Sequence, residues 1–200
     1  MSDSTPEGES PVIIATRVWL EKAVIGLNLC PFAKAVHVKG QIRYVVSSAH
    51  TPPELVRDLV QELQHLAATD ADETDTTLLI HPHVLSDFLD YNDFLDTADE
   101  VIDELNLAGE IQVASFHPRY QFAGTNANDI GNYSNRSPYP TLHLLREASI
   151  DKAVAAFPEA DDIFETNIAT LEKLGHDGWA KLGLSSGPGS DPVRAIDERE

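Results

Sequence analysis

The stretch VASFHPRYQFAGTNANDIGNYSNRSPYPTLHLLRE, residues 113–147, joins one strand-like run to another through a long loop rich in Gly and Asn. A compact domain rarely keeps about 20 residues of irregular chain unless they are functional or disordered. The aromatic and imidazole side chains of this loop argue against disorder, because disordered segments are poor in aromatic residues. The loop is therefore predicted to contribute to an active site.

Strands and helices alternate along the rest of the chain. Short apolar or β-branched runs predict four strands, at residues 42–47, 76–80, 111–116 and 141–145. Apolar residues at helical spacing predict helices at residues 14–27, 54–66, 88–105 and 163–174. This alternation is typical of an α/β layered fold, and we expect a mostly parallel sheet of about four strands flanked by helices.

Several helix boundaries have sequence signals. Thr51-Pro52-Pro53-Glu54 combines an N-cap, prolines in the first turn and a capping-box glutamate. Ser149 is predicted to cap a short helix that ends at Pro158, and Gly175 is predicted to end the last helix.

Length and composition predict a single folded domain. The chain has 200 residues, 42% of them hydrophobic, which suffices for one core. Residues 1–11 and 185–200 are small, polar and rich in Gly or Pro, so we expect disordered tails around a domain at residues 12–184. The sequence predicts neither a signal peptide nor a membrane span. Cys30 is the only cysteine, so no disulfide forms within the chain, and a reducing cytoplasm is the expected location.

Charge is unevenly distributed along the chain. The formal net charge is −19, and residues 54–110 alone carry sixteen acidic side chains and one basic one. Such a surface repels phosphate backbones, so nucleic acid is not an expected partner. Residues 31–53 and 111–147 are net positive, and a small anion is the partner that this local charge favours. The alternative is that the acidic residues only keep helices solvated.

Histidines follow two of the predicted strands. In parallel α/β sheets ligands bind beyond the carboxyl ends of strands, where His81, His83 and His117 are expected. Three histidines can bind zinc with an open position for water, and Asp87 could complete such a divalent metal site. The alternative is that these histidines are bonded to backbone carbonyls.

Two further side chains are candidates for catalysis. His143 alternates with leucines in the last predicted strand, so it is either a catalytic group beside the core or a buried neutral histidine. Cys30 is either a nucleophile or an inert buried thiol, because a reactive thiolate needs positive charge close by.

The loop itself offers groups suited to an anion. Arg119 and Arg136 could hold a carboxylate or phosphate, and amide and hydroxyl groups follow in Asn135, Ser137 and Tyr139. The alternative is that Arg136 holds a turn together.

Four segments of the chain are distinctive: VIGLNLCPFA (24–33), SFHP (115–118), YQFAG (120–124) and NRSPYPTLHLLRE (135–147). They resemble those of a bacterial family known as domain of unknown function 1415, and the likeness extends over about residues 16–184. The resemblance implies a cytoplasmic bacterial protein but supplies no reaction and no catalytic residues.

Three hypotheses remain open at the level of sequence. The first is an enzyme that acts on a small anionic molecule, with Arg119 and Arg136 binding the anion and His117 transferring protons. The second is a hydrolase with a metal ion on histidines. The third is a protein without enzymatic activity that binds a metabolite or an assembly partner. The sequence does not predict the oligomeric state.

Overall fold

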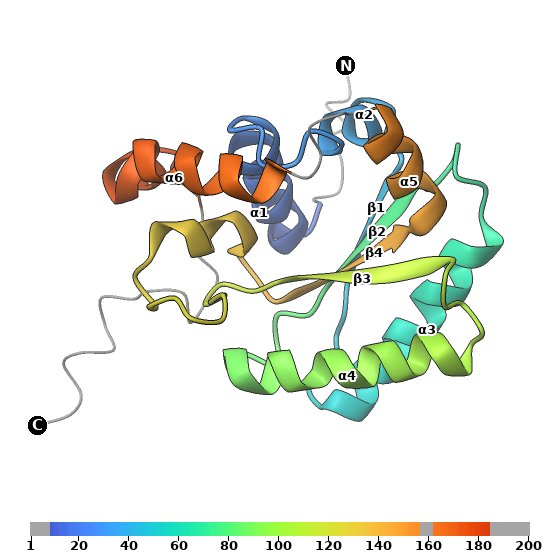
Figure 1. Ribbon diagram of the computed structural model, residues 1–200. Helices are drawn as coiled ribbons and strands as arrows, with labels where there is room; N and C mark the ends of the chain where they lie inside the picture. Colours follow the sequence, from blue (N-terminus) through green and yellow to red (C-terminus); the bar gives the residue numbers. More distant parts are fainter. Residues whose placement is uncertain (1–8, 157–161, 185–200) are drawn as a thin grey trace, which may run out of the picture.

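The computed structural model describes residues 9–156 and 162–184. A sheet of four strands in the order β1-β2-β4-β3 lies between two layers of helices (Figure 1). The strands are β1 (Ile42–Val46), β2 (Thr76–Ile80), β3 (Ile111–Phe116) and β4 (Thr141–Arg146). All four predicted strands are confirmed within one residue at their ends.

The expected mostly parallel sheet is wrong, because the sheet is mixed. Only β1 and β2 pair in parallel, whereas β4 is antiparallel to both β2 and β3. A parallel connection needs a crossover that carries the chain back along the sheet, usually a helix. The β3–β4 loop contains only the short 3-10 helix η2 (Ile130–Asn135), so β4 begins at the end where β3 finishes. β1, β2 and β3 still run in one direction, and their carboxyl ends share one edge.

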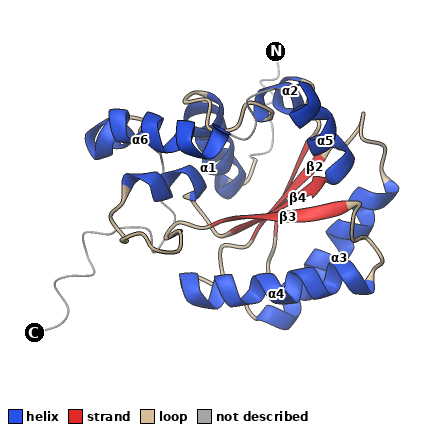
Figure 2. Cartoon of the chain, viewed as in Figure 1, coloured by secondary structure: helices blue, strands red, loops and turns tan. Residues whose placement is uncertain are grey.

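One face of the sheet is covered by α3 (Pro52–Ala68) and α4 (Phe88–Glu104) (Figure 2). The predicted capping box is confirmed, with Thr51 and Glu54 at the start of α3. The helix buries four leucines completely, at the predicted spacing, against Leu79, Leu142 and Leu144 of the sheet. These leucines are Leu55, Leu59, Leu63 and Leu66.

The remaining helices lie on the side of the other face (Figure 1). The predicted helix at residues 14–27 is α1 (Pro11–Trp19) followed by the π-helical segment η1 (Leu20–Ile25). The sequence did not predict α2 (Ala33–Val38). The remaining helices are α5 (Glu147–Ala156) and α6 (Ile163–Ala180).

Two helix boundaries differ from the prediction. α5 continues directly from β4, so Ser149 lies inside the helix and is not its N-cap. Pro158 lies outside the described residues. Gly175 does interrupt α6, with a φ of 65°, but the helix resumes and ends at Ala180. A glycine can adopt this left-handed conformation without a steric penalty, which is why the kink falls there.

The predicted tails lie mostly outside the described residues. Of the proposed N-terminal tail, Pro11 is the first residue of α1 and Ser10 is its N-cap. Among the residues that the structure describes, no helix is long and apolar enough to cross a membrane.

Candidate functional site

A cavity of about 320 Å³ lies between the sheet and the helices that cover its second face. Helix walls come from α1, η1, α2 and α5. Most of the lining is apolar, as expected of a site for a small organic molecule. The apolar lining residues include Trp19, Leu20, Val24, Phe32, Val36, Ile42, Leu78, Ala114, Phe116, Leu145 and Ile150. We call this space the sheet cavity.

The strand register places His143 in the floor of the sheet cavity. His143 faces Leu78 on one neighbouring strand and Ala114 on the other. Phe116 lies beside it, with 5.9 Å between the ring centroids, and Trp19 packs edge-on against Phe116 at 5.2 Å. The imidazole is therefore surrounded by apolar groups.

The hydrogen bonds of Thr76 determine which nitrogen of His143 carries a proton. The Thr76 hydroxyl lies 2.7 Å from the Leu144 carbonyl oxygen and 2.7 Å from Nε2 of His143. Because a carbonyl only accepts, the hydroxyl donates to Leu144 and accepts from Nε2–H. Nδ1 of His143 is then an unprotonated acceptor, and none of the described residues donates to it.

Burial keeps this imidazole neutral. Desolvation lowers the pKa of His143 from 6.5 to about 4. The residue as a whole is only half-buried, because part of it lines the cavity. At neutral pH the sheet cavity therefore contains a neutral histidine with a free lone pair.

Cys30 also lines the sheet cavity. Burial raises the pKa of its thiol, and backbone N–H groups of Phe32 and Ala33 offset only part of this effect. The thiol is therefore protonated at neutral pH, which favours the inert alternative over the nucleophile.

Ser149 and Arg146, at the edge of the cavity, bond to a neighbouring carboxylate and to the backbone. The Ser149 hydroxyl donates to Asp75 at 2.5 Å. Arg146 donates from Nη2 to the carbonyls of Leu66 and Thr69 at 2.6 Å, at the carboxyl end of α3. Among the described residues of the lining, the Gln112 amide and Nη1 of Arg146 make no hydrogen bond, and His143 contributes the nitrogen that can accept one.

A second group of side chains lies at the shared carboxyl edge of the strands, as the sequence predicted for His81 and His117. Both rings pack on Tyr91 of α4, at centroid distances of 5.7 Å and 5.1 Å. All three residues are fully buried. We call them the strand-end cluster.

Backbone hydrogen bonds occupy most of the imidazole nitrogens of this cluster. His117 accepts from the Arg119 N–H at Nδ1 and donates from Nε2 to Leu85 at 3.2 Å. His81 donates from Nδ1 to Val84 at 3.0 Å, and its Nε2 has no partner among the described residues. Desolvation lowers the pKa of each histidine to about 4. Because both nitrogens of His117 are occupied by backbone groups, the structure favours the alternative of backbone-bonded histidines over His117 as an acid or base.

The structure does not bring the three predicted metal ligands together. His83 is exposed and stacks on His50 at a centroid distance of 5.0 Å, away from the packing of His81 and His117 on Tyr91. Within residues 9–156 and 162–184, no group of three or more His, Cys, Asp or Glu side chains could hold a metal ion. Asp87 instead caps α4 and pairs with Arg119 at 3.3 Å.

Arg136 lies within the long loop and binds the loop's own backbone. Nε donates to the Tyr120 carbonyl at 3.1 Å and Nη2 donates to Ala127 at 2.6 Å. The guanidinium also lies 4.4 Å from the ring centroid of Tyr133. This placement favours the alternative that Arg136 holds a turn.

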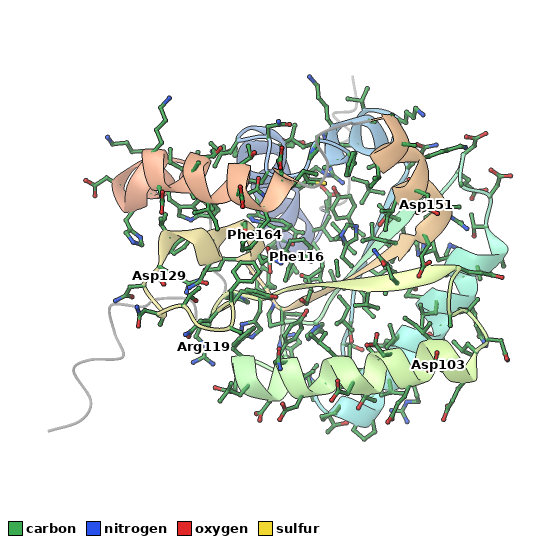
Figure 3. The ribbon with its side chains drawn as sticks, viewed as in Figure 1. Asp103, Phe116, Arg119, Asp129, Asp151 and Phe164 are labelled. Atoms are coloured by element: carbon green, nitrogen blue, oxygen red, sulfur yellow. The ribbon has the colours of Figure 1, made fainter. Side chains whose placement is uncertain are left out.

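The other predicted anion-binding residues are also held by local bonds. Arg119 lies at the surface beside the first turn of α4 (Figure 3), where it donates to the Ser86 carbonyl at 2.6 Å. Asn135 donates to the Ser115 carbonyl, and Ser137 donates to Tyr139 at 2.6 Å. Thr141 donates to the same carbonyl of Tyr139. The side chains of Arg119, Asn135 and Ser137 are therefore committed to backbone carbonyls.

Removing the Arg136 side chain is expected to destabilise the loop. Arg136→Ala deletes two charge-assisted hydrogen bonds and should lower the free energy of unfolding by about 1–3 kcal/mol. Arg136→Lys should recover only part of this loss, because a lysine lacks the planar fork. Urea denaturation measures the free energy of unfolding of each variant. Amide hydrogen exchange at residues 120–133 shows whether the loss of stability lies in the loop. Unchanged stability and exchange would show that these bonds are not formed in solution.

Comparison with known families supports the resemblance noted in the sequence. Residues 11–181 match the family described as protein of unknown function DUF1415. The chain belongs to this family. No curated protein and no solved structure matches it. The matched range runs from the first residue of α1 to the residue after α6, so the DUF1415 region includes both the sheet cavity and the strand-end cluster.

Sequence reasoning missed the sheet cavity of this DUF1415 domain. Its lining comes from helices with ordinary apolar spacing, which equally predicts a filled core. One sequence signal did point to helices on both faces of the sheet. An uninterrupted run such as residues 76–80 is typical of a strand that is covered on both faces, and every residue of β2 is buried in the structure.

Proposed function

We propose that this DUF1415 protein is an enzyme that acts on a small, largely apolar molecule bound in the sheet cavity, with Nδ1 of His143 as the proton acceptor. One observation carries the proposal: a neutral imidazole with a free lone pair lies in the floor of an apolar cavity. A general base must be unprotonated and within reach of its substrate, and a neutral His143 that lines the cavity supports this role.

Thr76 supports this role by fixing the tautomer. Because its hydroxyl is committed to the Leu144 carbonyl, it can only accept from Nε2–H of His143. A proton taken up at Nδ1 would give an imidazolium whose Nε2–H remains bonded to Thr76. Thr76 is therefore proposed as a positioning residue that orients the imidazole.

This proposal differs from the hypothesis of an anionic substrate held by Arg119 and Arg136. Both guanidinium groups already donate to backbone carbonyls, of Ser86 and of Tyr120 and Ala127 respectively. An anion at either arginine would have to compete with these bonds. A ligand in the sheet cavity would leave these bonds intact.

Binding without chemistry is the second candidate function. It is favoured by the low pKa of His143, about 4, which makes the imidazole a weak base. His143→Gln separates the two candidates once a ligand is known. Glutamine retains hydrogen-bonding ability but cannot transfer the proton, so turnover should fall at least ~100-fold while binding changes much less.

Narrowing the sheet cavity is expected to abolish ligand binding. A ligand present at 100 times its Kd stabilises the folded state by about 2.7 kcal/mol, which raises Tm by roughly 5–10 °C in a protein of this size. Ala114→Phe places a ring beside His143 and should remove this shift. A thermal-shift screen of small apolar molecules bearing an O–H or N–H group provides the measurement.

The matched control is Ala67→Phe, because Ala67 is exposed on α3 on the opposite side of the sheet. This variant should keep the ligand-induced shift of the wild type. If Ala114→Phe remains folded and shows the full shift, the ligand binds elsewhere and the proposal is wrong.

A further inference from the structure

We infer that the sheet cavity selects an uncharged ligand that donates a hydrogen bond to Nδ1 of His143, and that it rejects the corresponding anion. The inference rests on the proposed function, because it names the class of molecule bound at the same site. It also replaces the anionic substrate predicted from the charge of the loop with a neutral donor such as an alcohol, a phenol or an amide.

The donors and acceptors of the cavity support this class of ligand. His143 presents an acceptor at Nδ1, because its proton is on Nε2. The Thr76 hydroxyl has already given its single proton to Leu144. A ligand that reaches Nδ1 must therefore bring its own hydrogen-bond donor.

The positive charge of Arg146 in the cavity lining is offset by the carboxylate of Asp75, so the lining offers an anion no net positive charge. The carboxylate of Asp75 lies in the cavity lining and accepts the Ser149 hydroxyl. Arg146 also contributes to the lining, and its Nε and Nη2 donate to backbone carbonyls, including that of Thr74, which leaves Nη1 as its one group without a bond to the described residues. A carboxylate in the cavity would meet a lone pair on His143 in mostly apolar surroundings, where an unpaired charge is strongly disfavoured.

The volume of the cavity suggests the size of the ligand. An apolar cavity of about 150 Å³ accommodates benzene in another protein. The sheet cavity is about twice as large, at 320 Å³. A molecule with two fused rings is therefore a suitable probe, and 2-naphthol supplies two rings with one hydroxyl.

Three probes of nearly equal size separate donor, apolar and anionic ligands. We expect 2-naphthol to bind wild-type protein at least ~10-fold more tightly than 2-methylnaphthalene, which lacks the donor. We expect 2-naphthoate, the carboxylate, to bind at least ~10-fold more weakly than 2-naphthol. Calorimetric titration of the full chain at pH 7.5 gives the three affinities.

Substitution of His143 tests whether this group is responsible. His143→Phe keeps the aromatic volume but removes the acceptor, so 2-naphthol and 2-methylnaphthalene should bind this variant with affinities within ~3-fold of each other. His65→Phe is the matched control, because His65 is exposed on α3, and it should retain the preference for 2-naphthol. Circular dichroism shows whether each variant is folded. If a variant does not fold, the three affinities of the wild-type protein still test the inference.

The possible outcomes distinguish this inference from the proposed function. Equal affinities for 2-naphthol and 2-methylnaphthalene in wild type would overturn the donor rule but leave the cavity as a binding site. Tightest binding of 2-naphthoate would overturn the rejection of anions. Failure of every probe to bind at millimolar concentration would contradict both the inference and the proposed function.

Discussion

Lowering the pH from 7 to 5.5 is expected to reduce the free energy of unfolding by roughly 4 kcal/mol. Three buried histidines cause this loss: His81, His117 and His143 each have a pKa lowered to about 4 by desolvation. In the unfolded chain a histidine titrates near 6.5, so the unfolded state binds protons first as the pH falls. The folded state loses stability between about pH 6.5 and pH 4, and below pH 4 both states are protonated.

The magnitude follows from proton linkage. Each histidine contributes about 1.2 kcal/mol between pH 7 and pH 5.5, and about 3 kcal/mol over the whole range down to pH 4. The total of ~9 kcal/mol is comparable with the entire stability of a typical domain, so acid unfolding is expected between pH 5 and pH 4. Most carboxylates stay ionised at pH 5.5, so this first part of the loss belongs to the histidines.

Urea denaturation at pH 7 and pH 5.5 measures the effect. His143→Gln removes one of the three groups and should reduce the pH-dependent loss to about 2.5 kcal/mol. His65→Gln replaces an exposed histidine and should keep the wild-type loss. A wild-type loss below ~1.5 kcal/mol would mean that the three histidines accept protons in the folded state, and His143 would then be charged in mildly acidic solution.

Local signals were sufficient to place the strands, but not to set their directions. The run Thr76–Ile80 is apolar and short, and the capping box at Thr51 and Glu54 starts a helix wherever the chain goes next. The direction of β4 depends on how residues 117–140 return to the sheet. The course of residues 117–140 depends on hydrogen bonds between residues that are distant in the sequence, such as those from Arg136 to the carbonyls of Tyr120 and Ala127. No sequence pattern predicts which backbone carbonyl an arginine will bind.

The candidate site was predicted in part for a related reason. Alternation along β4 correctly placed His143 on the opposite face from Leu142 and Leu144. The cavity above His143 depends on how closely η1 and α5 approach the sheet, and periodicity does not encode that distance. The arginines of the loop were predicted to be available to an anion because the backbone carbonyls that they bind cannot be seen in a sequence.

The buried hydroxyl of Tyr91, in the strand-end cluster, is expected to stabilise the fold, and Tyr91→Phe should lower the free energy of unfolding by about 2–5 kcal/mol. The hydroxyl of Tyr91 donates to the Thr141 carbonyl at 2.8 Å and accepts from the Phe116 N–H at 3.1 Å. Phe116 and Thr141 face each other in the β3–β4 register. The hydroxyl therefore bridges the last residue pair of the ladder, and its loss leaves a buried donor and a buried acceptor without a partner.

Tyr44→Phe is the matched control for this substitution. The hydroxyl of Tyr44 is also buried, but it makes no bond to the strand backbone, and the Arg17 guanidinium lies over its ring at 5.2 Å from the centroid. Removing it should change stability by less than ~1 kcal/mol, because no buried backbone donor or acceptor loses its partner and the ring under Arg17 is retained. Urea denaturation of both variants at pH 7.5 gives the comparison. A loss of stability below ~1 kcal/mol for Tyr91→Phe would contradict this role of the hydroxyl. It would mean that the Phe116 N–H and the Thr141 carbonyl form a direct ladder hydrogen bond in the variant. The Tyr91 hydroxyl would then act by keeping the two strand ends apart, beside the ring on which His81 and His117 pack.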